Sequence, residues 1–251
     1  MAVSVRRIDS FRTLLAQAMS EAVADLPALK FNDDPQQLAV AAIYATILQS
    51  TDECLLLLNR SSVTSVGSII RSMLESFADL CAVIAEPTYV ERMLATFEDQ
   101  KLRLLKNMSR SRSDEFYKDL AGQLDVEAMK SQVSTALSEY RSRGHQALSN
   151  AERFREADLI YIYESLYWHL CLSGHNDISS LERRHIRVSD GSVELIMLRE
   201  NDLQEVAIYL EALLAIVSDG SLRVHRLVAS PRVRHYEQRA SELLAFRKAA
   251  I

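Results

Sequence analysis

Three polar side chains recur at four-residue intervals within a largely apolar segment of the chain. They are Arg71, Glu75 and Asp79, in segment 68–85. A four-residue interval places side chains on one side of a helix, so we expect a polar stripe along an apolar helix. Such a stripe needs polar partners from another element when the helix is buried. An arginine beside a carboxylate can form an ion pair, bind an anion or supply acid–base groups.

A second polar stripe has the same interval at the end of another apolar segment. Tyr167, Cys171 and His175 follow one another at four-residue spacing. We predict that the two stripes meet inside a helical bundle, where Arg71, Glu75, Tyr167 and His175 form the candidate site. Two interpretations stay open. One is a satisfied, buried ion-pair network, and the other is an anion-binding or acid–base site with perturbed pKa values.

Motifs for metal and nucleotide chemistry are incomplete or absent in the sequence. Glu182 and His185 form one E-x-x-H motif, whereas a di-iron bundle needs two such motifs and two further carboxylates. No G-x-S-x-G, P-loop or G-x-G-x-x-G pattern is present. Cys54, Cys81 and Cys171 lie in apolar helical patterns without C-x-x-C spacing, so we expect buried thiols in a reducing cytosol. We expect no metal and no cofactor.

The net charge limits which partners the chain can attract electrostatically. The chain has 29 Lys and Arg against 34 Asp and Glu, which gives a net charge of −5. General attraction to phosphate backbones or anionic membranes is therefore not expected. Basic residues are concentrated in the last segment, 231–250, and could contact RNA locally. The net charge of the whole chain does not favour RNA binding. An acidic partner is the other ligand expected for this segment.

The sequence predicts a cytoplasmic protein without membrane contact. Residues 1–11 are not followed by the apolar core of a signal peptide. The most apolar window, 206–217, contains Glu211 and is shorter than the ~20 residues that span a bilayer. We expect a protein partner or a homodimer.

The elements that must position the candidate site are helices. Six Gly and four Pro in 251 residues are too few for the many turns of a barrel or sandwich. We predict an all-α fold, a single domain over 1–251 built as one bundle of seven to nine helices. Apolar periodicity of three and four residues predicts helices at 8–29, 35–59, 69–86, 88–108, 116–123, 126–143, 151–173, 202–219 and 231–250.

One short β-hairpin is predicted at 186–198. Asp190-Gly191, a pair that favours positive φ, separates two runs of alternating apolar residues. Two strands alone are marginally stable, so this hairpin should pack on the bundle or pair with a partner. A dimer is therefore one expectation.

Four aromatic residues share the helix predicted at 151–173. Tyr161, Tyr163, Tyr167 and Trp168 could line a pocket or a surface on which bases stack. Aromatic residues at helical spacing on a long central helix belong more often to the core. We therefore expect these four side chains to pack inside the bundle.

Two blocks of sequence resemble a known family. Residues 69–80, IIRSMLESFADL, resemble the R-S-x-x-E helix of a widespread bacterial helical family known only as a domain of unknown function. Residues 167–175, YWHLCLSGH, are similar to the Y-x-x-L-S-x-x-x-H helix of that family, with Cys171 where the family has serine. The resemblance covers about 51–186. The family positions that it implies are Arg71, Glu75, Tyr167 and His175.

The helices of that family are similar to those of HEPN-type proteins, many of which are ribonucleases of toxin and phage-defence systems. These enzymes place Arg and His on one helix as R-x4-6-H, where both can reach a phosphate. No arginine has that spacing here, and the nearest pair is Arg141-x3-His145.

Two function hypotheses follow. The first is a non-catalytic interaction or sensor protein of a bacterial stress or phage-defence system, in which the candidate site is structural. The second is a HEPN-like, metal-independent ribonuclease. The missing motif and the acidic net charge favour the first hypothesis.

Overall fold

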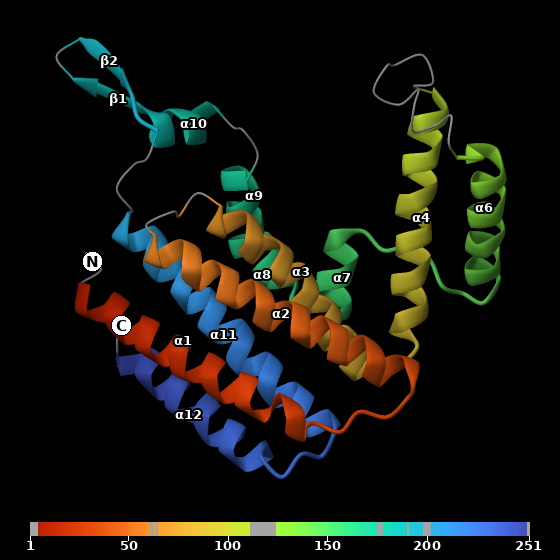
Figure 1. Ribbon diagram of the computed structural model, residues 1–251, viewed down its shortest axis with the longest axis horizontal. Helices are drawn as coiled ribbons and strands as arrows, with labels where there is room; N and C mark the ends of the chain where they lie inside the picture. Colours follow the sequence, from red (N-terminus) through yellow and green to blue (C-terminus); the bar gives the residue numbers. More distant parts are fainter. Residues whose placement is uncertain are drawn as a thin grey trace. The chain divides into compact units, whose positions relative to one another are not determined.

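The fold is a succession of helices interrupted by one hairpin (Figure 1). The described part of the chain contains one sheet, which is two-stranded and antiparallel, so the predicted all-α class with a single hairpin is confirmed. Two compact units are present, one formed by 1–85 with 154–251 and the other by 86–153. The expectation of a single domain stays a prediction. The computed structural model describes residues 5–60, 63, 65–110, 124–174, 178–189, 191–197 and 202–249.

The first unit is organised around α11 (Leu203–Leu227), which is apolar on nearly all sides. This helix contacts α1 (Val5–Asp25), α2 (Pro35–Asn59), α3 (Val66–Ala85) and α12 (Val233–Ala249). Figure 1 shows these four helices around α11. Burial of the apolar side chains of α11 therefore requires all four neighbours. A short 3₁₀ turn, η1 (Leu26–Ala28), follows α1.

Several predicted helix ends have the expected local chemistry. The Asp34 side chain accepts a hydrogen bond from the backbone N–H of Gln37 and caps α2, with Pro35 in its first turn. Ser149 and Glu152 bond each other's backbone N–H groups as a capping box at the start of α7 (Asn150–Glu156).

The prediction of a single helix at 151–173 is wrong. The structure divides it into α7, α8 (Ile160–Ile162), a π-helical turn η2 (Tyr163–Tyr167) and α9 (Trp168–Gly174). Asp158 has φ of 57°, and the N–H of Leu159 bonds the carbonyl of Phe154. This is a Schellman arrangement, in which an Asp occupies the left-handed position more commonly held by Gly. The apolar periodicity hides this break because Phe154 and Leu159 remain buried on both sides of it.

The predicted end of the helix at Asp219 is also wrong. α11 continues for two more turns and ends at Leu227, followed by Ala229 with φ of 48°. The continuation is stabilised by burial, since Ser221 and His225 are almost fully enclosed. Within it, the hydroxyls of Ser221 and Tyr44 lie 2.7 Å apart. Tertiary packing therefore outweighs the tendency of Gly220 to end a helix.

Among the described residues, one helix has the length and composition expected of a membrane span. It is α2, whereas the sequence pattern indicated 206–217 as the most apolar window. The core helix of a soluble protein passes the same test, and α2 buries Tyr44, Ile47 and Cys54 against its neighbours.

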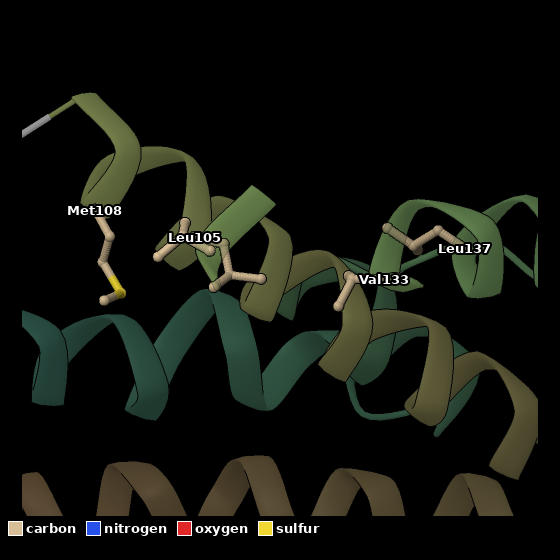
Figure 2. Packing of buried hydrophobic residues seen from close by; sticks show 5 residues of the cluster. Leu105, Met108, Val133 and Leu137 are labelled. Atoms are coloured by element: carbon tan, nitrogen blue, oxygen red, sulfur yellow. The ribbon is translucent and has the colours of Figure 1, made fainter. Parts of the chain in front are cut away.

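The second unit contains α4 (Tyr89–Arg110) and α6 (Val126–Ser142), which pack against each other. Figure 2 shows side chains of their shared apolar cluster. Gly144, with φ of 86°, follows the end of α6, close to the end at 143 that the sequence predicted. The helix predicted at 116–123 lies outside the described residues. The cluster consists of Leu105, Met108, Val126, Val133 and Leu137.

This small cluster should control the stability of the second unit. Leu105→Ala removes a fully buried side chain from it and should lower the free energy of opening of α6 by about 2–3 kcal/mol. The measurement is amide hydrogen exchange of α6 in the full chain. Leu104→Ala is the matched control, because Leu104 is exposed on the same helix and its loss should change little. Equal effects of the two variants would contradict this prediction.

Candidate functional site

Two residues of α3 meet the last residue of η2. Nε of Arg71 donates a hydrogen bond to Oη of Tyr167 at 3.4 Å, and this hydroxyl donates to Oε1 of Glu75 at 2.6 Å. Nε of Arg71 also lies 3.8 Å from Oε1 of Glu75 as an ion pair one helical turn apart. We call these three residues the Arg71 cluster. The structure thus brings together three of the four predicted site residues, and His175 lies outside the described residues.

The electrostatics of the Arg71 cluster keep Arg71 charged and Tyr167 neutral at neutral pH. Burial and the hydrogen bond to Glu75 raise the pKa of Tyr167 to about 12. The hydrogen bond with Tyr167 and the charge of Glu75 raise the pKa of Arg71 above its usual value. Tyr167 therefore stays a neutral hydroxyl that donates to a carboxylate. It is a poor proton acceptor, because its lone pairs already face the guanidinium.

Aromatic packing holds Tyr167 in this position. Its ring stacks on Tyr163 with 5.1 Å between centroids and lies 5.1 Å from the ring of the buried Phe154. The guanidinium carbon of Arg71 lies 5.6 Å from the centre of the Tyr167 ring. A π-helical turn is rarer than α-helix and is found often at functional sites. Here the π-helical turn ends at Tyr167. The ring contacts of Tyr167 and its hydrogen bonds with Arg71 and Glu75 fix the end of the turn.

The prediction that all four aromatic residues of this segment belong to the core is partly wrong. Tyr167 is buried, but Tyr161 and Trp168 are 63% and 59% exposed. The breaks at Asp158 and η2 change the direction in which successive side chains point, so a single helical periodicity does not describe them. Tyr161 and Trp168 therefore present aromatic surface to solvent.

The remaining predicted residues do not join the Arg71 cluster through the bonds described. Asp79 is buried on α3, and Cys171 is half-buried where a fully buried thiol was expected. Burial raises the pKa of the Cys54 and Cys81 thiols to about 12, so both stay protonated and unreactive. The described cysteines are all free thiols.

Neither of the other candidate motifs forms a site. Arg141 lies in the last turn of α6, whereas His145 follows Gly144, whose positive φ ends the helix between them. His185 ends α10 (Ile178–His185), and its Nδ1 lies 3.1 Å from the carbonyl oxygen of Ile196. Among the described residues, no group of three or more His, Cys, Asp or Glu side chains could hold a metal ion.

A second polar cluster, which the sequence did not predict, joins α1 to the start of α12. Asp25 accepts hydrogen bonds at 3.0 Å from Nε of Arg232 and from the Tyr236 hydroxyl. Glu21 accepts bonds from His235 and Arg239. Burial raises the pKa of Glu21, but the hydrogen bonds from its two basic partners outweigh this and hold the pKa below its ordinary value.

The basic residues of the last segment are largely occupied by carboxylates of the same chain. Arg232 pairs with Asp25, Arg239 pairs with Glu21, and Nε of Arg247 lies 2.9 Å from Oε1 of Glu211. An arginine in such a pair has less charge available for a phosphate. The expected RNA or acidic partner of this segment therefore finds few uncompensated cations among these arginines.

His225 lies beside the second cluster and is almost fully enclosed at 1% exposure. Its ring stacks on Tyr236 with 4.1 Å between centroids, and its Nδ1 lies 2.8 Å from Oγ of Ser230. Nε2 has no hydrogen-bond partner among the described residues. Burial lowers the pKa of His225, with Arg232 acting in the same direction and Asp25 opposing both. His225 is therefore neutral in the folded protein at pH 7.

Removal of one hydroxyl should show what the Arg71 cluster contributes to stability. Tyr167→Phe leaves the ring stack in place but removes the donor to Glu75, and should lower the free energy of unfolding by about 1 kcal/mol. Tyr163→Phe is the matched control, because the described structure shows ring contacts but no hydrogen bond for Tyr163. Urea unfolding measures both. A loss no larger for Tyr167→Phe than for Tyr163→Phe would count against a structural role.

The lowered pKa of His225 predicts a pH dependence of folding. The unfolded chain takes up a proton near pH 6.5 and the folded chain only at lower pH, so stability is complete above 6.5 and falls as pH decreases. The loss contributed by one proton is at most about 1.4 kcal/mol per pH unit. His225→Gln should make the decline between pH 7 and pH 5 shallower, measured by urea unfolding at each pH. An unchanged slope would show that His225 already titrates normally when folded.

Comparison with known proteins places the Arg71 cluster within a family. The model of a family of unknown function, DUF5677, matches residues 37–193. The match includes α2, α3, η2 and all members of the Arg71 cluster, whereas Asp25, His225 and Arg239 lie outside it. No curated protein and no solved structure matches the chain significantly. Since the matched residues make up more than half of its length, the chain belongs to the family of unknown function DUF5677.

Proposed function

We propose that this chain is a non-catalytic interaction or sensor protein of the cytosol, in which the Arg71 cluster is structural. One observation carries the proposal. The Tyr167 hydroxyl donates to Glu75 and accepts from Arg71, so all three groups bind one another. A role in a bacterial stress or phage-defence system stays a prediction.

An acid–base catalyst needs a group whose pKa lies near the working pH and which can reach substrate. Tyr167 has its pKa raised to about 12 and is buried against Phe154 and Tyr163. Using it as a base would require breaking its bond to Glu75 and removing a proton that burial retains. These properties support a structural role for the hydroxyl.

The ribonuclease alternative has less support. A HEPN-type site needs Arg and His on one helix face, and the nearest pair is separated by the end of α6 at Gly144. The arginines of the last segment that pair with carboxylates offer little free charge to a phosphate backbone. The HEPN relation itself remains an expectation from the resemblance.

Support for the interaction half of the proposal comes from apolar side chains that lie in solvent. Tyr161 and Trp168 are exposed beside the buried Tyr167. On the β-hairpin, Val188, Val193 and Leu195 are each at least 70% exposed. Large apolar side chains exposed to solvent can mark sites where proteins associate.

The proposal predicts that the purified full chain does not cleave RNA. Total RNA incubated without metal ions should remain intact with the wild type, with Arg71→Lys and with the surface control Arg103→Lys, as judged by electrophoresis. The reason is that Tyr167, the hydroxyl bonded to Arg71 and Glu75, has its pKa raised to about 12 and so keeps its proton instead of taking one from a ribose hydroxyl. Fragmentation by the wild type and by Arg103→Lys that disappears in a normally folded Arg71→Lys would overturn the proposal.

A further inference from the structure

The two faces of the β-hairpin differ completely in polarity. Its strands are β1 (Ile186–Ser189) and β2 (Ser192–Leu195), and they pair Ile186 with Leu195 and Val188 with Val193. Directly paired residues project from the same side of a sheet, as do alternate residues along a strand. These four apolar side chains therefore form one continuous face. We call it the hairpin apolar face.

The opposite side of the hairpin is polar. Nη1 of Arg187 lies 3.4 Å from Oε2 of Glu194 across the strands, and Ser189 pairs with Ser192. The hairpin is therefore amphipathic in the manner of a sheet that covers an apolar core. In the described structure no such core lies beneath it.

The hairpin apolar face is uncovered in the described part of the chain. Exposure rises from 39% at Ile186 to 82% at Leu195, and Met197, just beyond β2, is 83% exposed. The strands contact each other and β1 contacts α10, at whose end Figure 1 shows the hairpin. An isolated two-stranded sheet with its apolar side in water is marginally stable. A covering surface would therefore stabilise it.

We propose that the hairpin apolar face packs against the same face of a second copy of this chain. This inference rests on the proposed interaction function and identifies the partner. The face is self-complementary because it contains aliphatic side chains and no charge, so two copies meet without like-charge repulsion. A two-fold axis through the interface would leave Arg187 and Glu194 of both copies in solvent.

The size of the face agrees with a reversible dimer. Its apolar side chains expose on the order of 500 Å² per copy, compared with about 800 Å² per partner in an interface of standard size. An interface at the low end of this range is transient, and a dissociation constant of about micromolar order is expected. The two hairpins would stack as two sheets about 10 Å apart.

Sedimentation velocity of the purified full chain over a range of concentrations tests the proposal. The wild type should shift from monomer to dimer as concentration rises. Val188→Lys places a charge in the hairpin apolar face and should weaken association at least tenfold. Ser189→Lys is the matched control, because it adds the same charge at the adjacent position on the polar side and should leave association unchanged. Val193→Lys repeats the test on the other strand.

The outcomes separate the two proposals. A wild type that stays monomeric at every concentration overturns self-association through the hairpin, and so does a dimer that Val188→Lys and Ser189→Lys weaken equally or not at all. Neither of these results bears on RNA cleavage. RNA cleavage that depends on Arg71 overturns the non-catalytic function, whatever the mass of the particle. Equal melting temperatures of the two lysine variants exclude unfolding of the helices as the cause.

Discussion

A helix that is apolar on nearly every side must be covered on nearly every side, and α11 imposes this requirement on the first unit. Its buried residues extend from Val206 to His225, past a glycine that would otherwise favour a helix end. α1, α2, α3 and α12 supply the covering surfaces. The positions of the polar clusters follow from this arrangement. Ion pairs join α1 to the start of α12 at one place, and α3 presents Arg71 and Glu75 on a side that η2 covers.

The two polar clusters solve the same physical problem in different ways. The side chains of Arg71, Glu75 and Tyr167 form hydrogen bonds with one another, and the Tyr167 ring stacks on Tyr163. Polar side chains can therefore lie at a packed contact between helices. The Glu21 and Asp25 carboxylates instead form ion pairs with basic residues at the start of α12. Burial keeps the neighbouring His225 neutral. The first cluster lies inside the region that defines the family, and the second lies outside it.

Local chemistry made much of the fold predictable, and long-range packing limited the rest. Asp190-Gly191 predicted a hairpin correctly, because a tight turn depends on adjacent residues. Four-residue spacing predicted that Arg71, Glu75 and Tyr167 would meet, whereas the pairs of Asp25 and Glu21 lie more than 200 residues apart and leave no periodic signal. The left-handed Asp158 and the π-turn η2 interrupt a pattern that reads as one helix. Core membership of Tyr161 and Trp168 was therefore mispredicted.

The central claim is that the bond between the Tyr167 hydroxyl and Glu75 holds η2 against α3. A double-mutant cycle measures this directly, with urea unfolding of the wild type, Glu75→Gln, Tyr167→Phe and the double variant. If the two side chains stabilise the contact together, the coupling energy should be about 1–2 kcal/mol in favour of the native pair. Changes that add within about 0.3 kcal/mol would contradict the claim and would return the cluster to consideration as a site shaped for a ligand.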